Sequence, residues 1–194
     1  MRVIAGSARG RRLSSVPGSS VRPTADRVKE ALFSMLASRF DLAGAEVLDL
    51  FAGSGGLGIE ALSRGAASVT FVERVAAARR VLAANLERCG MGARGRVLAA
   101  PVETALRDLG RRGARFDGVL LDPPYGRDLA AAGLVALAAL DLTRPGAWVA
   151  AEHHVDDPLA DTYGPLRLTV GKRYGKTALA LFEDTRPTEQ TAGP

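Results

Sequence analysis

Short apolar runs alternate with longer amphipathic stretches along most of the chain. A short apolar run bounded by turn residues is typical of a buried strand, whereas apolar residues at spacings of three and four indicate a helix. The strands predicted on this basis are residues 46–51, 68–73, 96–100, 116–122, 147–152, 166–170 and 178–182. The predicted helices are residues 58–64, 76–88, 103–112 and 129–140, preceded by one that Thr24 or Asp26 caps and that runs to about Arg39.

The alternation of these elements predicts an α/β fold. Strands joined by helices form βαβ units, and such units build a parallel sheet with helices on its faces. The last two predicted strands have no helix between them, so they should pair as an antiparallel hairpin through residues 172–175. We therefore expect a seven-stranded, mostly parallel sheet with an antiparallel last strand.

The composition is typical of one globular domain in a reducing compartment. The chain has 194 residues, 47% of them hydrophobic, which is enough for a core without disulfides or metal. Its single cysteine, Cys89, cannot form a disulfide within the chain. The sequence shows no apolar signal core and no stretch of about 20 apolar residues, so we expect a cytoplasmic protein with no membrane anchor.

The net charge of +5 arises entirely from the start of the chain. Residues 1–22 contain five arginines and no acidic residue, whereas the remaining residues contain 21 basic and 21 acidic side chains. A flexible basic segment binds RNA by releasing counterions from phosphates; the alternative is a solvated tail. We expect an RNA-binding arm or hairpin over 1–22, a main domain over 23–184 and a disordered polar tail over 185–194. The candidate RNA-binding residues of the arm are Arg2, Arg9, Arg11, Arg12 and Arg22.

A glycine motif between the first strand of the sheet and the next helix indicates a cofactor site. Gly53, Gly55 and Gly58 have the spacing G-x-G-x-x-G, which suits NAD, FAD or S-adenosylmethionine. Asp49 precedes the glycines, where a carboxylate would repel a pyrophosphate but attract the amino group of S-adenosylmethionine. Glu73 ends the next strand, where it can accept hydrogen bonds from ribose hydroxyls. The alternatives are a helix-capping acid for Asp49 and a solvated strand end for Glu73.

The most specific motif is Asp122-Pro123-Pro124-Tyr125, at the end of the fourth strand. The two prolines stiffen the backbone and have no N–H, so the Asp122 carboxylate and the Pro123 carbonyl are fixed acceptors. Two such acceptors can hold both N–H groups of an exocyclic base nitrogen and localise its lone pair for attack on a methyl group. The Tyr125 ring can stack on a flipped or single-stranded base. The alternative is a rigid turn without chemistry.

Other polar residues give weaker signals. His153 and His154 are adjacent on a strand, so they cannot both face one metal, and no cysteine or aspartate spacing supports a zinc site. We expect no metal and read both histidines as structural. Arg111, Arg112 and Arg115 suit a solvated helix end, and Cys89 lacks the context of a covalent cytosine methylase.

Together these motifs resemble the RsmD family, bacterial class I methyltransferases that act on guanine N2 of 16S rRNA. The resemblance covers residues 1 to about 183 and is strongest at 2–6, 9–11, 22–33, 49–58, 122–125 and 173–177. It implies a Rossmann-like fold and S-adenosylmethionine as methyl donor. It also implies that the protein is a monomer and that its partner is 16S rRNA in the 30S subunit or its assembly intermediate.

Carried over to this chain, the resemblance assigns the site residues. It implies cofactor binding by Asp49, Phe51, Gly53, Ser54, Gly55, Gly58 and Glu73, catalysis by residues 122–125, and a place beside the active site for residues 22–27. Arg27 and Arg173 are further candidates for RNA contact; for Arg173, in the basic turn before the last strand, the alternative is a plain hairpin tip. Many relatives have an acidic or amide residue after the third strand to contact adenine, where this chain has Ala99-Ala100-Pro101. We therefore expect the backbone N–H of Val102 to make that contact.

Two other functions remain open at this stage. A DNA adenine-N6 methyltransferase would use the same four-residue motif, although it normally needs a further domain to read DNA. A non-catalytic RNA-binding assembly factor with a vestigial cofactor site is the second alternative, and the intact Asp122-Pro123-Pro124-Tyr125 motif argues against it.

Overall fold

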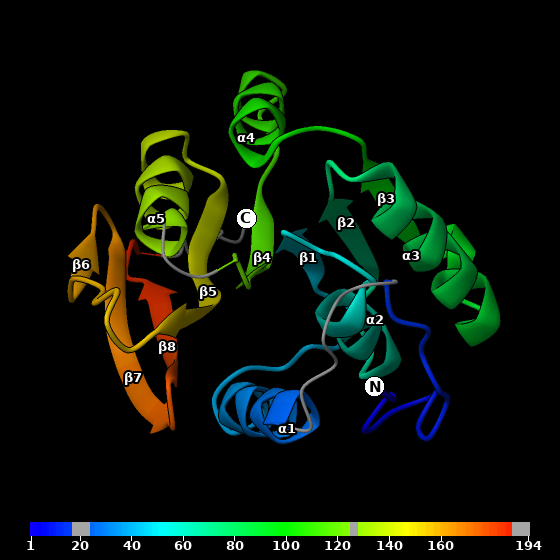
Figure 1. Cartoon of the computed structure of the whole chain (residues 1–194). Coiled ribbons are helices and arrows are strands. Elements are labelled where there is room, and N and C mark those ends of the chain that lie inside the picture. The colour runs from blue at the N-terminus through cyan, green and yellow to red at the C-terminus, as the bar shows by residue number, and fades with distance from the viewer. Residues whose placement is uncertain (17–23, 125–127, 188–194) are drawn as a thin grey trace, which may run out of the picture.

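The predicted strands assemble into one sheet in the computed structural model, which describes residues 1–16, 24–124 and 128–187 (Figure 1). Within these ranges the sheet has eight strands: β1 (Glu46–Leu50), β2 (Ser68–Val72), β3 (Gly95–Leu98), β4 (Phe116–Leu121), β5 (Thr143–His154), β6 (Thr162–Tyr163), β7 (Leu166–Tyr174) and β8 (Thr177–Asp184). Arg22, Tyr125 and the end of the predicted tail, 188–194, lie outside the described residues.

The strand order is β3-β2-β1-β4-β5-β8-β7-β6. The first five strands run parallel, and β8 is antiparallel to both of its neighbours, β5 and β7. The predicted mostly parallel sheet with an antiparallel last strand is therefore confirmed. The additional strand, β6, has two residues, too few to leave a recognisable pattern in the sequence.

Helices cover both faces of the sheet: α1 (Thr24–Ala37), α2 (Gly56–Ser63), α3 (Ala76–Cys89), α4 (Val102–Arg111) and α5 (Leu129–Ala139), with a short 3-10 helix at Gly92–Arg94. Apolar residues of α1, α2 and α3 pack in one buried cluster, and those of α4 and α5 pack in another. Side chains alternate along β1, so Val47 belongs to the first cluster and Leu48 to the second. Asp49 consequently points to the α2 side. No helix among the described residues is both long and apolar enough to cross a membrane.

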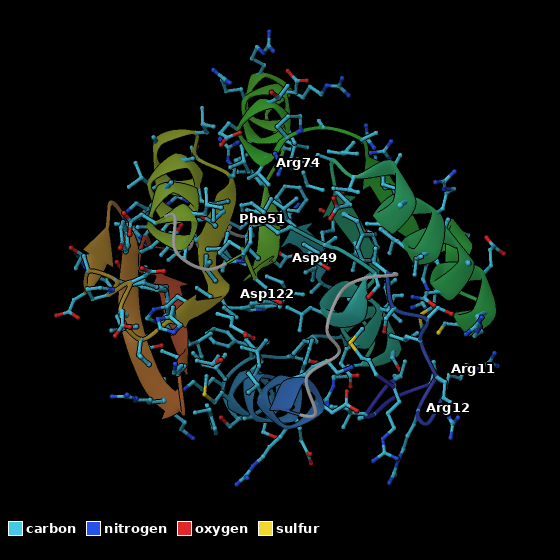
Figure 2. The ribbon with its side chains drawn as sticks, in the orientation of Figure 1. Arg11, Arg12, Asp49, Phe51, Arg74 and Asp122 are labelled. Atoms are coloured by element: carbon cyan, nitrogen blue, oxygen red, sulfur yellow. The ribbon has the colours of Figure 1, made fainter. Side chains whose placement is uncertain are left out.

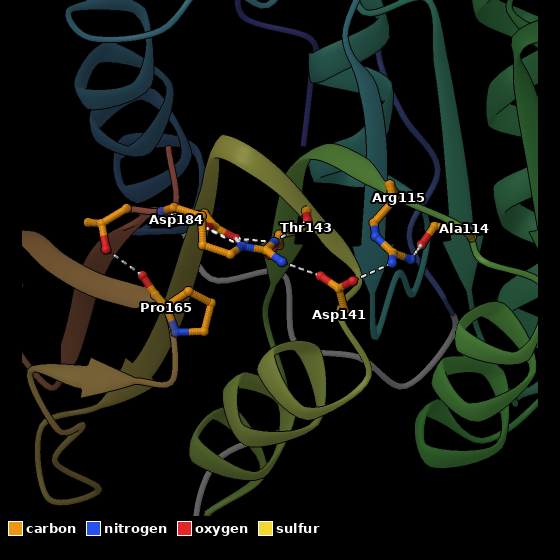
Figure 3. Close-up of polar contacts among 8 residues, drawn as sticks. Ala114, Arg115, Asp141, Thr143, Pro165 and Asp184 are labelled. Atoms are coloured by element: carbon orange, nitrogen blue, oxygen red, sulfur yellow. Dashed lines mark hydrogen bonds and ion pairs between the residues drawn. The ribbon is translucent and has the colours of Figure 1, made fainter. Parts of the chain in front are cut away.

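A network of polar contacts holds the strands together at the end of the sheet where β5 begins (Figure 3). The Arg186 guanidinium pairs with Asp184 and Asp141, and the Thr143 hydroxyl donates to Asp184 Oδ2 at 2.7 Å. Arg115, at the start of β4, pairs with the other oxygen of Asp141. These contacts join the beginnings of β4 and β5 to the end of β8. They lie at the edge opposite the carboxyl ends of the parallel strands.

The N-terminal hairpin (residues 1–13) is part of the domain core. Its two arms pair at Arg2 and Arg12, and its Val3, Ala8 and Leu13 are buried in the same cluster as α1 and α2. The Ala8 N–H donates to Ser63 Oγ at 3.0 Å, at the end of α2. The expectation of a flexible backbone is therefore wrong for these residues. Backbone bonds to α2 and three buried apolar side chains hold them in place, while the arginines remain exposed.

Candidate active site

A cavity of about 350 Å³ opens at the carboxyl ends of the central strands. Parallel neighbours end at the same edge of a sheet, and the register pairs Leu50 of β1 with Val72 of β2 and Leu121 of β4. The residues that follow these strands, Phe51, Glu73 and Asp122, therefore meet at this edge, and all three line the cavity. Figure 2 shows Phe51 and Asp122 near the centre of the molecule, with Arg74 beyond them.

The glycine loop next to this cavity has a backbone that larger residues would disrupt. Gly55 has φ +85°, and a Cβ there would lie 2.2 Å from Leu82 Cδ1 of α3. A Cβ on Gly58 would lie 2.2 Å from Phe71 Cε1 and 2.8 Å from Asp49 Oδ2. The loop thus turns tightly into α2 and brings the start of that helix close to the end of β1, the geometry expected of a nucleotide-type cofactor loop.

Asp49 is buried beneath the loop. Its Oδ2 accepts a hydrogen bond from the Gly58 N–H at 2.9 Å. Burial raises the pKa of the Asp49 carboxyl to about 7, against the opposing effect of that hydrogen bond. The structure therefore shows the helix-capping contact considered for Asp49. Its direct contact with a cationic amino group stays a prediction.

Asp49→Asn is expected to gain stability relative to the wild type as the pH rises. Between pH 4 and 7 the folded wild type binds a proton at Asp49 that the unfolded chain has released, so its free energy of unfolding falls as the pH increases. The free energy of unfolding of the asparagine variant does not fall in this way, because asparagine does not titrate, and its amide oxygen can still accept from the Gly58 N–H. The stability difference between variant and wild type should therefore rise by about 2–3 kcal/mol from pH 5 to pH 8.

Urea unfolding at the two pH values measures this difference. Asp156→Asn, on a carboxylate that is 83% exposed, is the matched control and should show no comparable change. A stability difference for Asp49→Asn that is the same at both pH values would contradict the raised pKa.

Glu73 links the glycine loop to the end of β2. Its Oε2 accepts from the Gly53 N–H at 2.9 Å, and its Oε1 accepts from the Val75 N–H at 2.7 Å. The carboxylate is half-buried in the cavity wall and is not a freely solvated strand end. Each oxygen retains a second lone pair, so contact with ribose hydroxyls stays compatible with these bonds.

The described part of the predicted catalytic motif, residues 122–124, lies on the opposite side of the same cavity. Asp122 and Pro124 are exposed and line it, whereas Pro123 is buried. Asp122 thus faces the cavity and not the interior. Tyr125 lies outside the described residues.

The third wall of the cavity comes from the start of α4. Ala100, Pro101, Val102 and Glu103 all line it. Val102 is the first residue of α4 and follows Pro101, so its backbone N–H belongs to the first turn, where donors have no partner within the helix. Arg74, Val75 and Leu129 also line the cavity, although none of them belongs to a motif in the sequence. Arg74 could have been expected at this site, because it directly follows Glu73 at the end of β2.

The two histidines lie at the end of β5, next to Pro123 and Pro124. They line a small hollow with Pro123 and Pro124. His153 Nδ1 lies 3.0 Å from the His154 carbonyl and 2.9 Å from the Asp157 carbonyl, which holds the chain in a turn. These contacts support a structural role. Over the ranges that the structure describes, no group of three or more histidine, cysteine and acidic residues is arranged to hold a metal ion.

The candidate RNA-binding arginines lie on three separate elements. Arg2, Arg9, Arg11 and Arg12 are exposed on the N-terminal hairpin. Arg27 is exposed on α1, and Arg173 is exposed at the end of β7, where its Nε donates to the Gly175 carbonyl at 3.0 Å. In the view of Figure 1 the hairpin, α1 and the β7–β8 turn all occupy the lower side of the molecule.

Comparison with known proteins gives a family match over almost the whole chain. Residues 1–183 match the family model described as Conserved hypothetical protein 95. The chain is 40% identical over 183 residues to YlbH of Bacillus subtilis strain 168, provisionally named an rRNA methyltransferase, a match covering 94% of this chain and 98% of the relative. It is 34% identical over 192 residues to ribosomal RNA small subunit methyltransferase D of Escherichia coli K12, covering 99% of this chain and 94% of that one.

A solved structure supports the same assignment. The Escherichia coli protein yhhF, provisionally named a methyltransferase, matches with a TM-score of 0.82 and 35% sequence identity. The match covers 95% of this chain and 97% of that one. The similarity therefore extends from the N-terminal hairpin to β8.

Proposed function

Because the chain belongs to the Conserved hypothetical protein 95 family, the RsmD family that its motifs resemble, we propose that it methylates guanine N2 in 16S rRNA with S-adenosylmethionine as donor. We place this activity in the cytoplasm, on the 30S subunit or its assembly intermediate, and in a monomer. The observation that carries the proposal is one cavity lined by Asp122 and Pro124 on one side and by Glu73 and Val102 on the other.

The residues present fit S-adenosylmethionine. A Cβ on Gly53 would meet only the Phe51 carbonyl, at 3.9 Å, so the loop is open there, and the start of α2 offers backbone N–H groups. Glu73 would accept from the ribose hydroxyls, the Val102 N–H would contact adenine, and Phe51 and Ser54 would complete the pocket. Asp49 lies beneath the loop, where a carboxylate favours a cationic amino group. When bound, the donor supplies a methyl group on a positively charged sulfur.

The catalytic motif would prepare the base for attack. The Asp122 carboxylate and the Pro123 carbonyl would each accept one N–H of the guanine amino group, which localises the nitrogen lone pair and aligns it with the methyl group. The amino nitrogen would take up the methyl group that the bound donor supplies, and the proton it releases would pass to the Asp122 carboxylate. Tyr125 would stack on the flipped base.

The exposed arginines of the N-terminal hairpin would bind rRNA phosphates. The triple variant Arg2→Gln, Arg9→Gln, Arg12→Gln is expected to weaken RNA binding about 10-fold at 0.15 M salt and to lower the slope of log K against log salt by about 2. Substitution is preferable to deletion, because deletion would also remove the buried Val3, Ala8 and Leu13. Filter binding across a salt series measures both quantities.

A matched variant controls for the change in net charge. The triple variant Arg107→Gln, Arg111→Gln, Arg112→Gln removes three positive charges from α4 and the residue after it, and α4 lies at the top of Figure 1, away from the hairpin. It should leave the salt dependence close to that of the wild type. If the slope of log K against log salt is equal for the hairpin variant and the wild type, the hairpin serves folding and not RNA binding.

Methylation of purified substrates tests the proposed function. The protein is incubated with labelled S-adenosylmethionine and either 30S particles from cells lacking the enzyme, protein-free 16S rRNA or DNA, and the modified nucleotide is identified by mass spectrometry. We expect N2-methylguanine in the 30S particles. Methylation of DNA alone would favour an adenine-N6 methyltransferase, and RNA binding without methylation would favour a non-catalytic assembly factor.

A further inference from the structure

Asn85, on α3, joins the N-terminal segment to the glycine loop. Its side chain is fully buried and uses its complete set of donors. Its Nδ2 donates to the Ser54 carbonyl at 2.9 Å and to the Ser14 carbonyl at 3.0 Å. Its Oδ1 accepts from the Ser14 N–H at 2.9 Å. One amide therefore connects α3, the segment after the hairpin and the loop between β1 and α2.

The loop contact is made at the position that shapes the cofactor site. Ser54 lies between Gly53, whose N–H is bonded to Glu73, and Gly55, whose N–H donates to the Ala52 carbonyl at 2.8 Å. The loop is thus fixed from the cavity side by Glu73 and from the far side by Asn85. Near the start of α2, the Met1 side chain occupies the space next to Gly56.

The other end of the connection is anchored independently. The Leu13 N–H donates to the Met1 carbonyl at 3.0 Å, which ties Ser14 to the paired arms of the hairpin. Arg88, one turn of α3 from Asn85, donates to the Arg12 carbonyl and to Ser14 Oγ, each at 3.2 Å. A displacement of the hairpin would therefore pull on Asn85, and a buried amide that loses its partners is costly.

We propose that Asn85 is a positioning residue through which the N-terminal hairpin sets the geometry of the cofactor loop. The inference rests on the proposed use of S-adenosylmethionine. It gives the hairpin a second role besides contact with RNA, because its position determines how well residues 53–55 receive the cofactor. Asn85 itself touches neither the base nor the methyl group in this arrangement.

Ser14 offers a clean test, because both of its bonds to Asn85 use backbone atoms. Ser14→Pro removes the N–H that donates to Asn85 Oδ1. Ser14→Ala keeps both bonds to Asn85 and removes only the hydroxyl, which accepts from Arg88. We expect Ser14→Pro to raise the Kd for S-adenosylhomocysteine and the KM for S-adenosylmethionine about 10-fold, with kcat and the KM for 30S particles within about two-fold of the wild type. Ser14→Ala should stay within about two-fold in all four quantities.

A second variant protects the test against misfolding of the proline variant. Asn85→Asp keeps the shape and the acceptor for Ser14 but places an oxygen against the two carbonyls, so it should weaken S-adenosylhomocysteine binding at least as much. Wild-type affinity in both variants would overturn the inference, and so would loss of the fold in both by circular dichroism, since the network would then serve folding alone. A wild-type protein that does not bind S-adenosylhomocysteine would instead overturn the proposed function and this inference together.

Discussion

Replacing Asp122 with alanine is expected to lower kcat for methyl transfer by about 10²–10³-fold. The carboxylate faces the cavity and is the charged one of the two acceptors assigned to the amino group. Its loss removes an interaction that strengthens as positive charge develops on the nitrogen, so kcat should fall more than substrate binding. The Kd for S-adenosylhomocysteine should change by less than about three-fold, because the cofactor contacts assigned above come from other residues.

Asp122→Asn tests the contribution of the negative charge alone, because asparagine has nearly the same shape as aspartate. The asparagine keeps one acceptor oxygen in the same place, so its kcat should lie between those of the wild type and the alanine variant. Single-turnover methylation of 30S particles gives the rate, and calorimetry gives the cofactor affinity. An alanine variant that turns over at the wild-type rate would remove Asp122 from the catalytic motif.

Replacing Glu60 with alanine is expected to destabilise the fold by about 3–5 kcal/mol. Glu60 is fully buried in α2, where its two oxygens accept from the Ile4 N–H at 2.8 Å and the Ala5 N–H at 3.0 Å. It also pairs with Arg64 at 2.8 Å and lies 3.6 Å from Nζ of the buried Lys29 on α1. Its removal leaves two backbone donors without their acceptor and takes the paired carboxylate from the Lys29 ammonium, which keeps only its hydrogen bond to the Arg2 carbonyl at 2.6 Å.

The stability loss should appear as a fall in Tm of about 10 °C in thermal unfolding. Glu60→Gln keeps an acceptor for the hairpin and should lose less stability, while Glu30→Ala, on an exposed carboxylate of α1, should lose about 0.5 kcal/mol or less. Lys29 has its pKa lowered by burial, opposed by Glu60, so the double variant Glu60→Ala, Lys29→Met should recover part of the loss. Equal stability of Glu60→Ala and the wild type would show that the hairpin does not depend on this carboxylate.

The order of elements and the two motifs were readable from the sequence because each depends on residues close together in the chain. The apolar runs that predicted β1 and β4 are short and end in glycine or proline, so their ends could be placed to within one residue. The spacing of Gly53, Gly55 and Gly58 predicts a tight turn. Once parallel strands are expected, the motif at the end of β4 must lie at the same edge as the glycines.

Predictions failed or were missing where partners are distant in the sequence. The burial of the N-terminal hairpin in the core was not predicted, since Val3, Ala8 and Leu13 are too widely spaced to indicate it. Strand β5 begins at Thr143, four residues earlier than predicted, because the polar and turn-forming residues 144–146 conceal its start.

The sequence by itself therefore determined the α/β class, the ends of β1 and β4 to within one residue, and the residue types available for methyl transfer. Only the tertiary structure decided that Glu60 holds the hairpin, that Asn85 joins Ser14 to Ser54, and that Asp49 caps α2 from a buried position. The physical reason is that buried polar groups must find partners, and the nearest partner in space can be 56 or 71 residues away in the chain. Local patterns record propensity and periodicity, whereas these pairings exist only after the sheet has brought α2, α3 and the hairpin together.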